Sequence, residues 1–299
     1  TYVKWDMNRH SIALGAKAHE FVLGLYDVLG RIFGPRPEIL LESCSSGGNR
    51  FDLGMLCYSP QVWCSDDTDP IERLTIQGNL SYLYPQSTFG AHVSASPHAQ
   101  TLRATPLATR ANVAFFGALG YELDLNHLVQ AEKDEIKEQV EFYKDYRLVF
   151  QFGSFRRLKN GWQVSDGKTT LVGVFRKLVA AAPGYETLRP RVLKADQVYR
   201  FRNRPQKLRI GAFANLIKHV VPVNPNPNGL IMHTADHFIT MPDGTQEVSA
   251  SGAAMMAGIR LLPLFRGTGY DQRQRTIGDF GSELYIIEEE NNREESGKA

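Results

Sequence analysis

Two groups of residues, far apart in the chain, have the side chains that nucleophilic and acid–base chemistry require. The first follows the short apolar segment 2–3 and contains Lys4, Asp6 and Asn8. The second is the acidic run at residues 66–69. Two carboxylates that face each other across a cleft suit glycoside hydrolysis, in which one attacks the sugar and the other donates a proton. Lys4 and Asp6 share a face of an extended strand, so the ammonium group should keep Asp6 ionised.

Other chemistries are compatible with some of these residues. Asp66 and its acidic neighbours could bind a divalent cation, but Asp69 is better suited to cap a helix and no further acidic partners lie nearby. His92 and Ser94 could belong to a Ser-His-Asp triad, although the sequence has no nucleophile elbow. Cys44 alone is not a metal site. No metal ion or cofactor is therefore expected.

Alternating strands and helices are predicted to position the two acidic groups. Short strands are expected at residues 2–3, 38–42, 61–64, 89–93 and 121–124, and helices at 11–33, 70–77, 105–116 and 132–146. This alternation, with polar loops after the strands, is typical of parallel βα units. A complete (β/α)₈ barrel takes about 250 residues, so this segment has room for roughly five units. Residues 1–146 are therefore predicted to form the C-terminal portion of such a barrel, with Asp6 and Asp66 at its mouth.

The pattern changes after Gly153, where short strands and hairpin-type turns replace the helices. Strands are expected at residues 162–164, 170–175, 197–201, 208–213, 230–233 and 284–287, with an exposed loop at 224–229. Residues 147–287 are predicted to form an antiparallel β domain. The polar residues 288–299 are predicted to be a disordered tail. The fold class is thus α/β, a partial (β/α)₈ TIM barrel followed by an antiparallel β-sheet domain.

The composition is that of an ordinary globular protein, with 42% hydrophobic and 22% charged residues among 299. A net charge of +2 gives no reason to expect nucleic acid or a membrane as a partner. Three cysteines, Cys44, Cys57 and Cys64, indicate a reducing compartment, and a cytoplasmic location is expected. The chain starts inside a predicted strand without an initiator methionine, so a longer parent protein is expected.

Three motifs together resemble the α-galactosidases of glycoside hydrolase family 36. They are Lys-Trp-Asp-Met-Asn-Arg at residues 4–9, Glu-Ser-Cys-Ser-Ser-Gly-Gly-Asn-Arg-Phe-Asp at 42–52 and Trp-Cys-Ser-Asp-Asp-Thr-Asp at 63–69. The resemblance continues at residues 120–124, 251–254 and 278–282. It implies a retaining enzyme for terminal α-galactosides such as melibiose and raffinose. It also implies a homo-oligomer, a tetramer in similar enzymes, and a match to the last five barrel strands and the C-terminal β domain.

The resemblance assigns roles to individual positions. Asp6 matches the family nucleophile and Asp66 matches its acid/base. Sugar-binding positions are matched by Lys4, Asn8, Cys44 and Gly47. Trp5 and Trp63 could each offer an apolar face to a pyranose or belong to the core. The sequence departs from the family pattern at Asn49, where glycine is common, and at Leu53, where proline is common.

Two alternatives to hydrolysis stay open from the sequence. Raffinose and stachyose synthases share the same glycosyl-enzyme intermediate but transfer galactose to a sugar instead of to water. An inactive carbohydrate-binding or structural fragment is the other alternative, because the family carries further sugar-binding groups in the first half of its barrel. A retaining mechanism predicts that the carboxyl groups of Asp6 and Asp66 lie about 5–5.5 Å apart.

Overall fold

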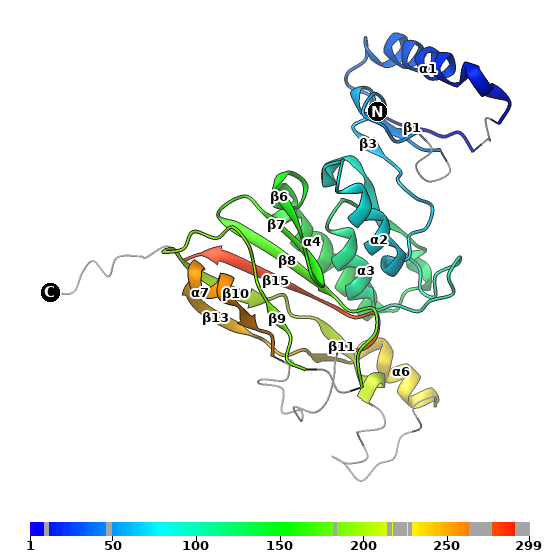
Figure 1. The fold of residues 1–299 in the computed structure, drawn as a ribbon. Helices are drawn as coiled ribbons and strands as arrows, with labels where there is room; N and C mark the ends of the chain where they lie inside the picture. The colour runs from blue at the N-terminus through cyan, green and yellow to red at the C-terminus, as the bar shows by residue number, and fades with distance from the viewer. Residues whose placement is uncertain are drawn as a thin grey trace. The chain divides into compact units, whose positions relative to one another are not determined.

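A computed structural model describes residues 1–8, 12–45, 50–181, 184–213, 217, 226, 229–262 and 277–290 (Figure 1). The chain divides into two compact units, and each is described by itself. The first unit comprises residues 1–104, 113–122 and 150–152. The second comprises residues 105–112, 123–149 and the described residues from 153 onward. The domain limits predicted at 146 and 287 stay predictions.

The first unit contains a strand at each of the five predicted places. These strands are β1 Tyr2–Trp5, β2 Leu40–Ser43, β3 Gln61–Val62, β4 Gly90–Ser94 and β5 Ala118–Glu122. However, β5 begins at residue 118 instead of 121 and ends at 122 instead of 124. The order β1-β2-β3 is parallel throughout, and β4 pairs with β5 in parallel. A parallel bridge between Val62 and Phe89 connects these two groups of strands. The strands therefore follow chain order, as consecutive βα units require.

Helices alternate with these strands along the chain. They are α1 Ala18–Phe33 after the 3₁₀ turn η1 Ile12–Lys17, α2 Pro70–Leu80, α3 Leu107–Ala114 and α4 Gln130–Phe152, with 3₁₀ turns η2 Met55–Cys57, η3 Gln86–Thr88 and η4 Leu125–His127. Leu29 and Phe33 of α1 pack with Leu41 of β2 and with Met55 in one buried cluster. This packing explains why Leu29 and Phe33 are apolar, since they cover the sheet, whereas Phe21, Val22 and Ile32 of the same helix are exposed.

The loop into α2 shows how local sequence sets a helix start. The Asp69 carboxylate accepts a hydrogen bond from the Ile71 backbone nitrogen at 2.8 Å, and Pro70 occupies the first helical position. Proline is favoured there because it has no N–H to leave unpaired. The predicted N-cap is confirmed, and it fixes the end of the loop that carries Asp66.

A six-stranded antiparallel sheet dominates the second unit, in the order β13-β10-β15-β8-β7-β6 (Figure 1). Its strands are β6 Ser154–Leu158, β7 Gly161–Ser165, β8 Thr169–Phe175, β10 Val198–Asn203, β13 Glu247–Ser251 and β15 Ser282–Glu289. Two small pairs accompany it, β9 Thr187–Leu188 with β14 Ile259–Arg260, and β11 Lys207–Arg209 with β12 Thr240–Pro242. Short helical segments complete the unit, namely η5 Ile210–Phe213, α6 Leu230–Phe238 and α7 Gly252–Ala257.

Three predictions for this unit need correction. The predicted strand 230–233 is the first turn of α6, because a short apolar run does not distinguish a strand from a helix. The predicted strand 208–213 ends at Arg209 and continues as η5. Two residues of the predicted tail, Glu288 and Glu289, belong to β15. Residues 291–299, and most of the predicted loop 224–229, lie outside the described residues.

No helix in the described part of the chain combines the length and the apolarity that crossing a membrane would require.

Candidate active site

Pairing between β1 and β2 positions the residues around Asp6. Lys4 lies opposite Glu42 and Trp5 opposite Ser43, and the Cys44 backbone nitrogen donates to the Trp5 carbonyl oxygen at 2.9 Å. The Trp5 ring packs edge-on against Phe33 of α1, with 6.1 Å between ring centroids. Trp5 is therefore a partly buried residue that packs against the core, which favours the structural one of its two predicted roles. Because strand side chains alternate, Lys4 is expected to point to the opposite face of the sheet.

Hydrogen-bond donors surround the Asp6 carboxylate. Asn8 Nδ2 donates to Asp6 Oδ2 at 3.0 Å, and the Cys44 thiol donates a second hydrogen bond. Desolvation alone would raise the pKa of Asp6. The hydrogen bonds from Cys44, Asn8 and the Met7 backbone outweigh it, together with the charge of Lys4, so the pKa is lowered. Asp6 is therefore ionised at neutral pH.

Cys44 is itself held in the thiol form. Burial raises the pKa of Cys44 to about 11, and its hydrogen bond to Asp6 acts in the same direction. The charges of both Asp6 and Asp66 also raise this pKa, so both carboxylates lie within electrostatic range of one thiol. Both aspartates that the sequence analysis paired thus act electrostatically on the same thiol.

Lys4 forms its ion pair with Glu42, whereas the sequence analysis paired it with Asp6. Lys4 Nζ lies 3.3 Å from Glu42 Oε1, and the Tyr2 hydroxyl donates to Glu42 Oε2. Burial raises the pKa of Glu42. The expectation that Lys4 favours an ionised Asp6 has the right direction, but Lys4 is the smallest of the effects that lower the pKa of Asp6.

Asp66 lies in the loop between β3 and α2. Its side chain is exposed, and Asp66 Oδ1 accepts a hydrogen bond from Trp63 Nε1 at 2.8 Å. The Trp63 side chain is buried, with 4% of the residue exposed. Trp63 therefore contacts the predicted acid/base with its polar edge, and its alternative role as an open platform for a sugar is not favoured.

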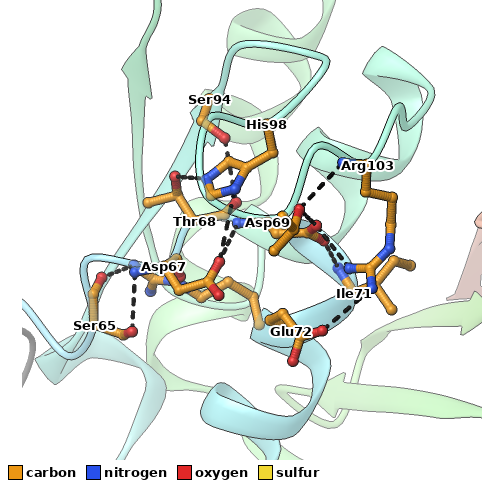
Figure 2. A network of polar contacts seen from close by, with 11 residues as sticks. Ser65, Asp67, Thr68, Asp69, Ile71, Glu72, Ser94, His98 and Arg103 are labelled. Atoms are coloured by element: carbon orange, nitrogen blue, oxygen red, sulfur yellow. Dashed lines mark hydrogen bonds and ion pairs between the residues drawn. The ribbon is translucent and has the colours of Figure 1, made fainter.

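A polar network holds the rest of this loop (Figure 2). Thr68 Oγ1 lies 3.1 Å from His98 Nε2, and Ser94 Oγ donates to the Thr68 carbonyl oxygen at 3.3 Å. Arg103 Nη1 donates to Asp69 Oδ2 at 2.7 Å. Asp69 is thus used for capping and ion pairing, as predicted. No group of three or more metal-ligating side chains occurs among the residues that the structure describes.

Two buried arginines brace the chain beside the two aspartates. Arg50, 8% exposed, donates to the carbonyl oxygens of Trp5 and Cys44. Arg73, 2% exposed, donates to the carbonyl oxygens of Ser65 and Asp67, each at 2.6 Å. Arg73 also donates to the Gly90 carbonyl oxygen and to the Cys64 sulfur, each at 2.9 Å. Each guanidinium group therefore fixes main-chain atoms next to one carboxylate.

Two candidate residues remain, His92 and Gly47. His92 Nδ1 lies 3.5 Å from Glu122 Oε2, and the His92 ring packs against Trp63. Desolvation lowers the pKa of His92. Gly47 lies outside the described residues, so its predicted role stays a prediction.

A family model described as Melibiase matches residues 1–153 of the 299-residue chain, which is just over half of it. The chain belongs to the melibiase family. This match covers both aspartates, every other predicted site residue, and all five parallel strands.

The relatives and solved structures that this melibiase-family chain resembles are α-galactosidases. α-Galactosidase AgaA of Geobacillus stearothermophilus is 46% identical over 218 residues, which cover 67% of this chain and 30% of that protein. α-Galactosidase 1 of Pediococcus pentosaceus is 52% identical over 169 residues, 53% of this chain and 23% of that protein. The crystal structure of AgaA, a GH36 α-galactosidase, matches with a TM-score of 0.73 and 37% identity. That match covers 97% of this chain and 36% of the AgaA chain.

These comparisons confirm the predicted glycoside hydrolase family 36 membership and the predicted fold class. The chain spans about a third of the length of AgaA. Variants of AgaA have also been solved with raffinose and with stachyose bound.

Some residues around the melibiase-family site were missed by reasoning from sequence. Glu42, Arg50 and Arg73 have no motif of their own outside the family resemblance, and their partners are set by strand pairing and loop packing. The one available signal for Glu42 was its place at the end of the predicted strand 38–42, since Lys4 directly follows the neighbouring predicted strand 2–3.

Proposed function

We propose that the protein carrying this chain is a retaining α-galactosidase that hydrolyses terminal α-D-galactosyl residues of melibiose- and raffinose-type oligosaccharides. The arrangement around Asp6 carries the proposal. Its ionised carboxylate receives hydrogen bonds from Cys44 and Asn8, and Asp66 lies within electrostatic range of the same thiol. The similarity to AgaA, which has been solved with raffinose bound, supports the substrate class.

In this proposal the reaction proceeds by double displacement. Asp6 attacks the anomeric carbon while Asp66 protonates the departing glycosidic oxygen, which gives a covalent galactosyl ester on Asp6. Asp66 then removes a proton from water, and the resulting attack on the ester releases galactose with the original anomeric configuration. Lys4, Asn8, Cys44 and Gly47 are proposed to bind the galactose.

Each environment suits its proposed role. A nucleophile must be ionised before the substrate arrives, and the donors around Asp6 lower its pKa. An acid/base must exchange protons with the leaving group and with water, and the Asp66 side chain is exposed. Cys44 cannot compete as a nucleophile at neutral pH, because its pKa of about 11 keeps it protonated.

The proposal is tested on the protein expressed from its full reading frame. NMR of the first product from 4-nitrophenyl α-galactoside should show α-galactose, and Asp6→Asn should abolish turnover while the protein stays folded. β-Galactose as the first product would contradict a retaining mechanism. Transfer of galactose to added sucrose in preference to water would instead indicate a synthase. The carboxyl groups should be about 5–5.5 Å apart in a crystal structure.

Two further features are proposed on the basis of the family. The protein is a homo-oligomer, which light scattering tests directly. Residues 1–146 and 147–287 act as the barrel portion and the β domain. Because residue 146 lies inside α4, limited proteolysis should cut beyond the end of this helix if the two parts fold as separate units.

A further inference from the structure

Trp63 makes a contact that its position in the core does not require. Its indole nitrogen, Nε1, donates to Asp66 Oδ1 at 2.8 Å, while the ring itself is buried. Its backbone nitrogen donates to the Ser43 carbonyl oxygen at 2.8 Å, at the end of β2. Trp63 therefore connects a rigid part of the sheet to an exposed carboxylate on a loop.

Side chains from three other elements hold the Trp63 ring. The His92 ring of β4 packs at 4.4 Å between centroids, and the Arg73 guanidinium carbon of α2 lies 5.0 Å from the ring centroid. Lys4 Nζ of β1 lies 4.9 Å from the same ring. A Cβ atom at Gly90 would approach Trp63 Cε3 to 2.9 Å, so glycine leaves the space that the ring fills. The direction of the indole N–H is thus set by packing.

The hydrogen bond from Trp63 occupies one oxygen of the carboxyl group. Within the described part of the chain, Asp66 Oδ1 has this partner and the structure gives no hydrogen bond to Asp66 Oδ2. A carboxyl group held by one oxygen has its second oxygen directed away from the donor, where a leaving-group oxygen could meet it. Holding a general acid in one orientation avoids the entropic cost of finding it in each turnover.

We propose that Trp63 is a positioning residue for the acid/base Asp66. It holds Oδ1 through its indole N–H and leaves Oδ2 to give its proton to the glycosidic oxygen and later to take one from water. The proposal rests on the proposed role of Asp66. It assigns to Trp63 no contact with the sugar and no proton transfer of its own.

The test compares substrates that differ in their need for an acid. Melibiose has a poor leaving group and depends on protonation, whereas 4-nitrophenyl α-galactoside releases a stable phenolate without it. Trp63→Phe keeps an aromatic ring in the cavity and removes the N–H. We expect kcat/KM for melibiose to fall about tenfold to hundredfold, which is part of the 10²–10⁴-fold that general acid catalysis supplies. For the nitrophenyl substrate the loss should stay within about threefold.

The matched control is Trp162→Phe, at a buried tryptophan of β7 in the second unit. A general effect of losing a core indole would lower both activities equally, so this variant should show no difference between the substrates. Equal losses for the two substrates in Trp63→Phe, or no loss for either, would overturn the proposal. If Trp63→Phe does not fold, Gly90→Ala decides, because it displaces the ring without removing it, and it should show the same substrate dependence.

A double-mutant cycle separates the positioning role of Trp63 from the acid/base role of Asp66. If Asp66→Ala shows no preference for the nitrophenyl substrate, the acid/base role fails and the positioning role fails with it. If Asp66→Ala shows that preference and Trp63→Phe does not, only the positioning role is wrong. In the Asp66→Ala background, Trp63→Phe should change neither activity further, since Trp63 acts through Asp66.

Discussion

The two proposed catalytic aspartates lie in differently built surroundings. Asp6 directly follows a strand, and Cys44 and Asn8 donate hydrogen bonds to its carboxylate. Asp66 lies in a loop and receives one described hydrogen bond, from Trp63. The main chain beside Asp6 is held by Arg50, and the loop of Asp66 is held by Arg73 and the network of Figure 2.

This difference follows from the two proposed tasks. A nucleophile needs its negative charge stabilised, and the donors around Asp6 supply that directly. An acid/base changes its protonation state twice in each cycle, so several strong donors to its carboxylate would hold it in the ionised form. The Asp66 loop is instead kept in place through its backbone, which leaves most of the carboxyl group available for chemistry.

The largest expected effect is the loss of activity when either aspartate is replaced by alanine, and rescue with azide distinguishes the roles of the two residues. Asp6→Ala should lose about 10⁴-fold or more in kcat on every substrate, because no ester can form. Added azide should attack the anomeric carbon from the face that Asp6 occupies in the wild type, which restores turnover and gives β-galactosyl azide. In Asp66→Ala, azide should attack the intact ester and give α-galactosyl azide. NMR of the products checks this assignment, and the reverse pattern would exchange the two roles.

Loss of the bracing arginines should destabilise the protein to different degrees. Each buried carbonyl oxygen left without its donor costs about 1–3 kcal/mol. Arg73→Met removes the donor to the carbonyl oxygens of Ser65, Asp67 and Gly90 and should cost about 3 kcal/mol or more. Arg50→Met leaves the Cys44 carbonyl oxygen without its donor, whereas the Trp5 oxygen keeps the Cys44 backbone nitrogen, so this variant should cost about 1–3 kcal/mol. Urea unfolding measures both.

The control for these arginine variants is Arg31→Met, at an exposed α1 residue paired with Asp27 at 3.4 Å. Its cost should stay within about 0.5 kcal/mol. If Arg73→Met cost no more than Arg50→Met, the proposed difference between the two loops would be wrong.

Substitution of Asp69 should lower the free energy of unfolding by a smaller amount that depends on pH. Desolvation opposes its ionisation, but hydrogen bonds from Thr101, the Ile71 nitrogen and Arg103 lower its pKa overall. A lowered pKa in the folded state means that this stabilisation is present above the unfolded pKa and is lost as pH falls through the folded pKa. Asp69→Ala should therefore cost about 1–2 kcal/mol at neutral pH.

In strong acid the wild-type carboxyl is protonated and loses the contribution of its charge, so the Asp69→Ala cost should shrink to that of the capping hydrogen bond, which a neutral carboxyl oxygen still accepts from the Ile71 nitrogen. Urea midpoints at several pH values measure it. Asp69→Asn, which keeps a capping oxygen for the Ile71 nitrogen, is the matched control and should lose less. A cost that does not depend on pH would contradict the charge-based explanation.

The smallest expected change concerns Cys44. Cys44→Ala removes one donor to Asp6, so the pKa of Asp6 should rise and the acid limb of the kcat/KM profile should move to higher pH. Cys44→Ser keeps a donor and should leave that limb nearly in place. A pH profile with an unchanged acid limb in Cys44→Ala would show that the thiol does not tune the nucleophile.

Local patterns in the sequence predicted much of this molecule. Helical spacing in α1, turn residues in the β6–β7 and β7–β8 hairpins, and Asp69 before Pro70 each depend on neighbours within a few residues. The parallel strand order followed from the strand–helix alternation. The same reasoning failed at residues 230–233, where a run of three apolar residues before His233 has no resolvable period and the chain forms α6.

The sequence by itself determined which residues could do the chemistry, because Asp6 and Asp66 are set by residue type and by motif. Only the tertiary structure decided what surrounds them. Glu42 lies beside Lys4 because of strand register, and Arg73 reaches the Gly90 carbonyl oxygen across a helix and a loop. Such partners are main-chain atoms or side chains brought together by packing. A backbone carbonyl has the same chemistry at every residue, so no pattern of amino acids reveals which one a buried arginine will bind.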